Sequence, residues 1–339
     1  MPGFKEKALT RLVGELLRTH GYKFVLSSEP PAGIDGRDEF GVPTPEGGQW
    51  RLVDVVAARW GQQSLVDAVA VECKRVGGLR DSINAALGQA TDYQTCFGQV
   101  FVATEAGEPR DKRFVLESLG LGHIVVDSVY HRAEFSLWPP GVQYARFEPS
   151  LHDQFVAARL AVALAFQEAS EDVAGVLRYG GTRRGGIWLA RAVVGNLQWN
   201  CWWDGTDRTV ACGINVEHKA DTRRIAERLG PARLAKALQD LPPRYRLWAM
   251  KVPVPGRAGA SAPFIYPHSE ARKVDAVRLL AATKEILPDR AWRPQINIYT
   301  RAWSSNERLE PRDYVSRLRD ARQQLSEVMK ALASCYEDT

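Results

Sequence analysis

Three residues whose side chains suit metal-assisted hydrolysis lie in or just after two apolar stretches. The run Ala68–Val71 ends in Glu72, and Lys74 follows two residues later. Asp54 lies 18 residues before Glu72, inside the apolar segment LVDVVA. Residues two apart on a strand share one face of a sheet. The sequence therefore predicts that Glu72 and Lys74 point to the same side, where the strand ends.

The spacing also predicts that Asp54 and Glu72 come together on neighbouring strands. Adjacent antiparallel strands joined by a loop of roughly ten residues can place the two carboxylates opposite each other. Carboxylates this close repel unless a cation lies between them. Mg²⁺ is the usual divalent ion for oxygen ligands, and we expect Mn²⁺ to substitute for it. Lys74 could then orient or deprotonate a metal-bound water, which would become the nucleophile for a phosphodiester.

Four elements in this order resemble the PD-(D/E)xK nuclease superfamily, over roughly residues 4–130. The resemblance is to its Mrr-like, Holliday junction resolvase-like and RecB-like branches. One departure is Val53, which stands where the family motif has proline, and this leaves the metal ligands in place. The matching elements are Glu15 in a first helix followed by HGYKFVL, Asp54 in a second strand, Glu72-Cys73-Lys74 closing a third, and Gln89-Ala90-Thr91-Asp92-Tyr93 as a Q-x-x-x-Y helix.

The resemblance implies a role for each matching residue. Mg²⁺ would be held by Asp54, Glu72 and the backbone carbonyl of Cys73, and Glu15 would bind a second ion or a metal-bound water. Lys74 would position the attacking water and stabilise the developing negative charge. Gln89 would hold the lysine or contact the scissile phosphate, and Tyr93 would support it. Each of Glu15, Gln89 and Tyr93 also has a simpler interpretation, as a surface or packing residue of its helix.

The function implied is a metal-dependent endonuclease that acts on DNA in prokaryotic restriction, anti-phage defence or repair. Two alternatives stay open. One is a catalytically inactive module of the same fold that binds nucleic acid or protein, and the other is a nuclease directed at RNA. The oligomeric state is also open between a monomer, a homodimer and a complex with a partner protein of a defence system.

Residue periodicity predicts an α/β fold with a mixed sheet flanked by helices, and the resemblance implies that this fold is of the restriction-endonuclease-like type. Apolar residues at helical spacing predict helices over 4–20, 80–97 and 110–119. Short β-rich runs predict strands over 22–26, 50–57, 65–74, 99–104 and 122–127, and residues 27–48 are expected to form a loop. The resulting order is α-β-β-β-α-β-α-β.

Prolines near 139–150 predict a boundary between a nuclease-like domain, 1–138, and a second α+β domain, 150–339. The second domain is expected to contain helices over 151–168, 220–240, 269–286 and 311–335. Its strands are expected over 186–194, 196–203, 209–217, 246–252 and 294–300.

The charge of the chain is unevenly distributed. Residues 1–150 carry 16 Lys and Arg against 19 Asp and Glu, and residues 151–339 carry 29 against 21, so the net charges are −3 and +8. Arginine binds phosphate through a planar fork, so the second half is a candidate for recognising a substrate or a partner. Arg183 and Arg184, between glycines, suit a loop that contacts nucleic-acid phosphates, although a plain hairpin turn explains them equally. Trp199, Trp202 and Trp203 could stack on bases or fill a core.

The five cysteines are scattered without a CxxC pair, which argues against a disulfide framework or a zinc site and favours a reducing cytoplasm. No apolar run approaches the roughly 20 residues that cross a bilayer, so we expect no membrane contact.

Overall fold

The computed structural model describes most of the 339 residues. The described ranges are 6–27, 40–43, 50–61, 66–74, 81–105, 111–140, 151–175, 177–181, 186–204, 209–253, 264–304, 307 and 309–337. Within them, no helix combines the length and the apolar character that a membrane span needs.

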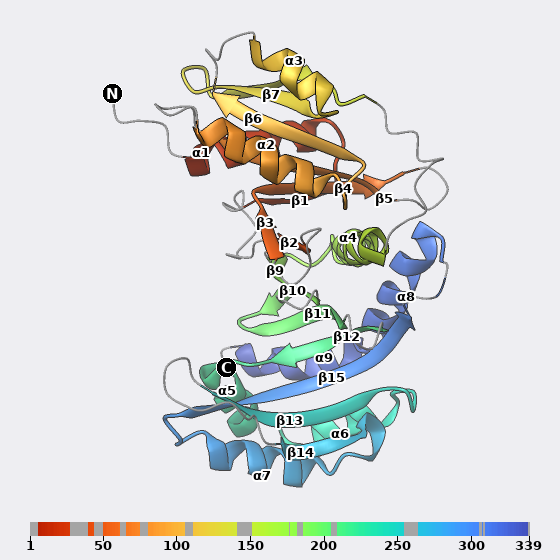
Figure 1. Ribbon diagram of the computed structural model, residues 1–339. Helices are drawn as coiled ribbons and strands as arrows, with labels where there is room; N and C mark the ends of the chain where they lie inside the picture. Colours follow the sequence, from red (N-terminus) through yellow and green to blue (C-terminus); the bar gives the residue numbers. More distant parts are fainter. Residues whose placement is uncertain are drawn as a thin grey trace. The chain divides into compact units, whose positions relative to one another are not determined.

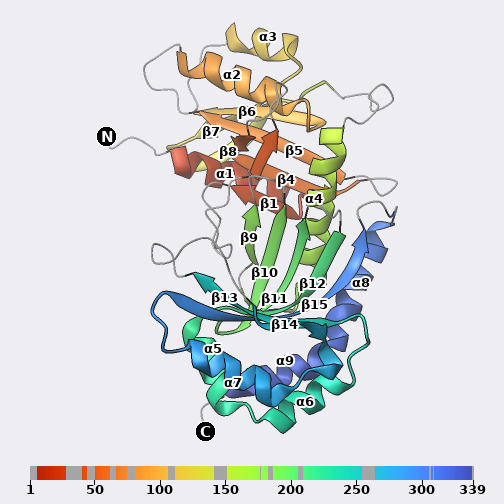
Figure 2. The same ribbon diagram turned by 60° about the horizontal axis from the view of Figure 1, so that its bottom comes forward.

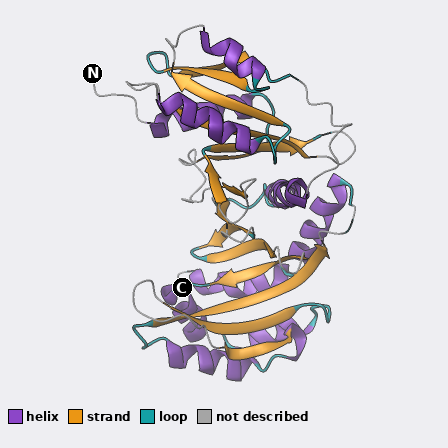
Figure 3. Cartoon of the chain, viewed as in Figure 1, coloured by secondary structure: helices purple, strands orange, loops and turns teal. Residues whose placement is uncertain are grey.

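Contacts within the chain divide it into two compact units, each of which is described by itself. The first is Met1–Gln167 with Arg178–Ile187 and Leu309–Pro311, and the second is Glu168–Leu177, Trp188–Arg308 and Arg312–Thr339. Each unit contains a β-sheet flanked by helices (Figure 3). The expected mixture of helices and strands is thus confirmed, with a mixed sheet in the first unit and an antiparallel one in the second.

The first unit is built on a six-stranded sheet (Figure 1). Its neighbours pair antiparallel at both edges, and β5, β6 and β7 pair parallel in the centre. The order is β1 (Phe24–Ser27), β4 (Val55–Trp60), β5 (Val66–Lys74), β6 (Gln99–Glu105), β7 (Gly122–Asp127) and β8 (Arg132–Leu137). The helices are α1 (Glu6–Thr19), α2 (Asp81–Tyr93) and α3 (Asp111–Ser118). Parallel neighbours need a crossover connection, which α2 provides between β5 and β6.

The two faces of this sheet are covered by different helices. On one face, Val69, Val71 and Cys73 of β5 join a core with α1 residues such as Leu9 and Val13. Successive side chains of a strand alternate between faces, so Glu72 and Lys74 point to the opposite face, where α2 packs against β5 and β6. Strand β5 is apolar over Ala68–Val71 and carries charged residues near its start, at Asp67, and at its end, at Glu72 and Lys74.

A small hairpin and a long helix complete the first unit. Strand β2 (Phe40–Pro43) pairs with β3 (Trp50–Val53). Helix α4 (Leu151–Ala169) carries the buried Arg159, which donates to the Gly41 carbonyl at 2.7 Å and lies over the Phe40 ring at 3.9 Å. Because of these contacts α4 groups with the first unit up to Gln167, whereas the sequence placed residues 150–339 together.

The second unit contains an antiparallel sheet with helices gathered on one face (Figure 2). Strand β9 (Leu177–Gly181) lies at the division between the units. The strand order from the edge is β14 (Phe264–Glu270), β13 (Arg246–Pro253), β15 (Trp292–Ser304), β12 (Thr209–Val216), β11 (Leu197–Asp204) and β10 (Ile187–Val194). The helices are α5 (Lys219–Arg228), α6 (Pro231–Gln239), α7 (Ala276–Ile286), α8 (Pro311–Gln324) and α9 (Ser326–Ala333).

Several element boundaries differ from those that the sequence predicts. The strand expected over 50–57 is two strands, β3 and β4, separated by a bend at Asp54. The helix expected over 220–240 ends and restarts at Gly230-Pro231, because proline cannot continue a helix but suits its first turn. Strand β2 lies in the segment 27–48 that was expected to be a loop, and β8 and β14 were not anticipated.

Candidate active site

Asp54 lies at the bend where the chain leaves β3 and enters β4. Its Oδ2 accepts a hydrogen bond of 2.8 Å from the backbone N–H of Cys73 on β5. The next residue, Val55, pairs with Val71, so Asp54 comes beside Glu72. The predicted proximity of these two carboxylates is therefore present in the structure.

Glu72 and Lys74 close β5 on the α2 face of the sheet. The Glu72 side chain is 2% exposed, and its Oε1 lies 3.0 Å from the Lys74 ammonium, whose side chain is 25% exposed. An isolated buried carboxylate is costly, so burial at this position requires a cation close by. Lys74 provides that charge from a side chain that still reaches solvent.

Tyr93, in the last turn of α2, is the second direct partner of Glu72. Its hydroxyl lies 2.8 Å from Glu72 Oε2 and 2.8 Å from the Leu52 carbonyl oxygen. Burial raises the pKa of Tyr93, and the negative charges of Glu72 and Asp54 raise it further. The phenol therefore stays protonated and serves as a hydrogen-bond donor that holds the buried carboxylate.

Gln89 lies one helical turn before Tyr93 and is half-buried. Residues four apart on a helix are neighbours on one face, so Gln89 and Tyr93 share a side of α2. Asp92 lies beside them and pairs with Arg51 of β3 at 2.7 Å. The structure thus brings the Q-x-x-x-Y helix against the strand that carries Glu72.

Glu15 is not brought to this cluster. It is exposed on α1, and its carboxylate lies 3.8 Å from the Arg11 guanidinium. Helix α1 packs against the Cys73 face of the sheet, whereas Glu72 points to the other face. Across the described ranges, no group of three or more His, Cys, Asp or Glu residues is placed to hold a metal ion.

Two polar residues near Lys74 escaped the sequence argument. Thr104 of β6 pairs in register with Lys74, and its hydroxyl hydrogen-bonds His123 Nε2 at 2.8 Å. The other ring nitrogen of His123 hydrogen-bonds the Ser136 hydroxyl at 2.7 Å. The pairing of β5, β6, β7 and β8 brings these hydrogen-bonded side chains together, and no spacing within the sequence indicates it.

The oxygen atoms in this cluster fit a hard divalent cation. Asp54 and Glu72 supply carboxylates, and the Cys73 carbonyl belongs to the same strand end. Mg²⁺ and Mn²⁺ prefer such oxygen ligands. Glu72 already contacts Lys74 through Oε1 and Tyr93 through Oε2, so a cation bound here would share Oε1 with the ammonium group or displace it.

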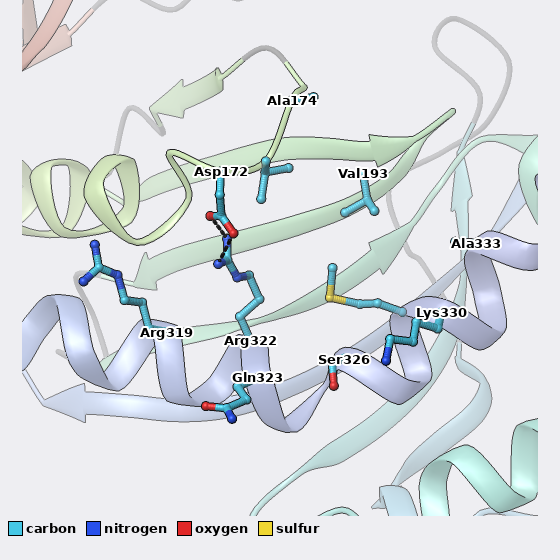
Figure 4. A pocket seen from close by; sticks show the side chains of 11 residues that line it. Asp172, Ala174, Val193, Arg319, Arg322, Gln323, Ser326, Lys330 and Ala333 are labelled. Carbon is cyan, nitrogen blue, oxygen red and sulfur yellow. Dashed lines mark hydrogen bonds and ion pairs between the residues drawn. The ribbon is translucent and has the colours of Figure 1, made fainter.

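A separate cavity of about 670 Å³ lies in the second unit, beside α8 and α9 (Figure 4). Arg322 on its wall pairs with Asp172 through two contacts of 2.6 and 2.7 Å. Hydrogen bonding from Arg322 lowers the pKa of the Asp172 carboxyl. Arg319 donates to the Glu168 carbonyl at 3.2 Å. These arginines thus bind groups of the chain itself, and the cavity shares no residue with the cluster around Glu72.

The remaining candidates for nucleic-acid contact divide between core and surface. Trp199 and Trp203 are buried, whereas Trp202 is 37% exposed. Two of the three tryptophans therefore belong to the core. Arg183 and Arg184 lie outside the described residues.

Comparisons with protein-family models, with curated proteins and with solved structures found no match. The class of this protein therefore rests on its fold and on the geometry of the cluster around Glu72. It is a mixed α/β protein in which two carboxylates, a lysine and a tyrosine converge where a central strand ends.

Proposed function

We propose that the chain is a metal-dependent endonuclease that hydrolyses phosphodiester bonds of DNA, with a restriction-endonuclease-like fold in its first unit. The observation that carries the proposal is the convergence of Asp54, Glu72 and Lys74 at the end of β5. The mixed sheet with α1 and α2 on opposite faces supports it. Restriction, anti-phage defence or repair in a prokaryote is the setting that this activity would serve.

Asp54, Glu72 and the Cys73 carbonyl would hold Mg²⁺ or Mn²⁺. When bound, the cation supplies positive charge next to the phosphate and makes water more acidic. Lys74 would orient the attacking water and stabilise the negative charge that develops on the phosphate oxygens. Gln89 would hold the lysine or contact the scissile phosphate.

The surrounding hydrogen bonds would keep these groups in position. The Cys73 N–H fixes one oxygen of Asp54, and the Tyr93 hydroxyl fixes one oxygen of Glu72. Both carboxylates are therefore oriented before any ligand arrives. Such preorganisation reduces the reorganisation that the reaction requires.

The test is cleavage of supercoiled, linear and single-stranded DNA, and of RNA, in Mg²⁺, in Mn²⁺ and in EDTA. We expect DNA cleavage that EDTA abolishes. Glu72→Gln and Asp54→Asn remove one negative charge each. Asp54→Asn keeps an oxygen that can accept from the Cys73 N–H, whereas Glu72→Gln keeps an acceptor for only one of Lys74 and Tyr93, so the circular dichroism of both variants is compared with that of the wild type. Both variants should lose cleavage and metal binding, and Glu117→Gln on the exposed face of α3 should keep both.

Cleavage of every nucleic acid at background level by the wild-type chain in both metals would refute the nuclease. Cleavage of RNA alone would replace DNA as the substrate. Retention of metal affinity in both Glu72→Gln and Asp54→Asn, measured by calorimetric titration, would show that the cation site lies elsewhere.

A further inference from the structure

One wall of the cavity beside α8 and α9 is a helical face within the second unit (Figure 4). Side chains three or four positions apart lie on one face of a helix. The Met329 N–H donates to the Leu325 carbonyl at 2.8 Å, so helical bonding continues through the junction of α8 and α9. The two helices therefore present one continuous face to the cavity. Its lining residues at this spacing are Arg319, Arg322, Ser326, Met329 and Ala333.

A second wall is a loop that is tied to strand β10. Arg191 of β10 donates to the Ser170 hydroxyl and to the Gly175 carbonyl, both at 3.0 Å. A Cβ built on Gly175 would meet the Ala192 carbonyl oxygen, so the loop backbone lies directly against the strand. Residues 172–174 of this loop line the cavity. The fold itself thus holds this wall in place, as is usual for sites that bind small molecules.

Arg322 and Asp172 meet across the cavity but differ in exposure. The Arg322 side chain is 19% exposed, and the Asp172 side chain is 71% exposed. Two guanidinium nitrogens contact the two carboxylate oxygens at 2.6 and 2.7 Å, which is the bidentate geometry that arginine adopts with a carboxylate or a phosphate. A shielded guanidinium needs an anion, whereas an exposed aspartate gains little from its ion pair. Asp172 therefore occupies a position that another anion could take.

A second guanidinium, that of Arg319, lies near the same position. Hydrogen bonding from Arg322 lowers the pKa of Asp172, and the positive charge of Arg319 lowers it further. Arg319 is exposed, and within the described part of the chain it makes one hydrogen bond, to the Glu168 carbonyl at 3.2 Å. Several of its N–H donors thus remain for a ligand. The two arginines mark the end of the cavity where an anionic group would bind.

The far end of the helical face is less suited to an anion. Lys330 already pairs with Glu327 at 2.7 Å. Apolar side chains of Val193 and Met329 line the cavity as well. Met329 lies about two helical turns after Arg322, which corresponds to roughly 10 Å along the axis. The lining thus changes from guanidinium groups to apolar groups over the length of a small organic molecule.

The size of the cavity agrees with such a ligand. Its volume is about 670 Å³, and cavities that bind small molecules measure roughly 300–1,000 Å³. We propose that it binds a small organic acid, with a carboxylate or a phosphate monoester at one end and an apolar body. Arg319 and Arg322 would bind the acidic group, while Asp172 would turn to solvent. The apolar body would lie against Val193 and Met329. The inference does not rest on the proposed nuclease, whose residues lie outside this cavity.

Calorimetric titration of the full-length chain in EDTA tests the proposal. The ligands are naphthylacetate and naphthyl phosphate. Naphthylacetamide is the neutral analogue, and acetate and inorganic phosphate represent the acidic groups alone. The variants are Asp172→Ala and Arg322→Gln. Arg272→Gln is the matched control, because Arg272 also belongs to the second unit, pairs with the carboxylate of Glu270 at 3.2 Å and does not line the cavity.

We expect both naphthyl acids to bind the wild type at least tenfold more tightly than the neutral analogue or either acidic group alone. Arg322→Gln should weaken their binding at least tenfold, because charged hydrogen bonds are lost. Asp172→Ala should strengthen it roughly two- to fivefold, because the variant removes a competitor held by an exposed ion pair. Arg272→Gln should bind as the wild type does. The tighter of the two naphthyl acids would identify the acidic group as carboxylate or phosphate.

Unchanged or weaker binding in Asp172→Ala would overturn the proposal, because the aspartate would then not compete with the ligand. Equal affinity for naphthylacetamide and naphthylacetate would show an apolar surface without recognition of an anion. The absence of heat with every ligand, in the wild type and in Asp172→Ala, would show that no such site exists. If circular dichroism shows that Arg322→Gln does not fold, Asp172→Ala still decides the question, because its side chain is largely exposed.

Discussion

Glu72 is a buried carboxylate that contacts partners of different kinds, Lys74 and Tyr93, among the described residues. Lys74 provides a full positive charge at 3.0 Å, and Tyr93 provides a neutral hydrogen bond at 2.8 Å. Because the pKa of Tyr93 is raised by burial and by the charge of Glu72, the tyrosine cannot take over the role of counter-ion. Among the described residues, Lys74 is therefore the side chain that offsets the negative charge of Glu72.

The first prediction follows for Lys74→Ala. Removal of the ammonium leaves the buried Glu72 without its cation, so the metal-free protein should lose about 1–3 kcal/mol of unfolding free energy. Single-turnover cleavage should fall by roughly two to four orders of magnitude. Affinity for Mn²⁺ should be unchanged or higher, because Oε1 no longer pairs with an ammonium.

Lys74→Ala is checked by urea unfolding with and without Mn²⁺ and by quenched-flow cleavage. Added metal should recover stability in the variant more than in the wild type, since it replaces the lost charge. Lys330→Ala, which removes an exposed lysine paired with Glu327, is the matched control. Cleavage within a few-fold of wild type would reduce Lys74 to a counter-ion of Glu72.

At the residue level, local pattern predicted part of the cluster. Alternation along β5 placed Glu72 and Lys74 on one face, and strand pairing brought Asp54 to them. The sequence did not reveal that Asp54 breaks its strand, because the surrounding residues are apolar on both sides. Glu15 was assigned by its order in the chain, which carries no information on which face of the sheet its helix covers.

Strand β12 shows how closely neighbouring elements approach. A Cβ built on Gly213 would meet the Ile298 carbonyl oxygen, and it would lie 2.8 Å from the Tyr299 Cα on β15. The Tyr299 side chain crosses this position to reach Asn200. Absence of a side chain at Gly213 therefore permits both the strand contact and the hydrogen bond.

The second prediction is opposite effects of two Gly→Ala substitutions. Gly213→Ala should lower the free energy of unfolding by about 1–3 kcal/mol, because the added methyl group has no space. Gly88→Ala should raise it by about 0.5–1 kcal/mol, because Gly88 lies inside α2 with nothing within 4 Å of the added carbon. Urea titration of both variants gives the comparison, and a neutral Gly213→Ala would show that β12 and β15 can separate.

The pairing register between neighbouring strands could not be predicted from the sequence. Asn215 and Asn297 are 82 residues apart and hydrogen-bond because β12 and β15 pair at those positions. Thr104 meets Lys74 for the same reason on β5 and β6. Most individual strands were predicted, since each has its own apolar pattern. Which residues face each other across them depends on tertiary packing, which no local pattern encodes.

Across the whole molecule, the five cysteines are free and buried. Cys201 and Cys212 face each other on β11 and β12. Burial raises the pKa of Cys212 from its ordinary 9.0 to about 12 and raises that of Cys201 well above 9.0. In the unfolded chain both thiols lose their protons near pH 9, whereas the folded chain retains them.

The third prediction is therefore a loss of stability at alkaline pH. Above pH 9 the unfolded state binds fewer protons than the folded state, so the free energy of unfolding should fall by up to about 1.4 kcal/mol per pH unit for each of the two cysteines. Urea unfolding between pH 9 and 10 measures the slope. Other buried groups with a raised pKa add to it, so the part due to the two facing cysteines is the part that their removal abolishes; these other groups are Cys335, Tyr93, Tyr245, Tyr299 and Tyr336. The fall of the unfolding free energy with pH should be less steep in the Cys201→Ala, Cys212→Ala double variant, whatever its absolute stability. An equally steep fall would contradict the raised pKa values of these two cysteines.

The bend at Asp54 joins two parts of the first unit. Strand β3 before it pairs with β2, and β4 after it belongs to the main sheet. Arg159, more than a hundred residues further on, holds β2 through the Gly41 carbonyl. The position of the β2–β3 hairpin therefore determines where the Asp54 carboxylate lies. A change in β2 or α4 would then shift the Asp54 carboxylate while Glu72, Lys74 and Tyr93 stay in place.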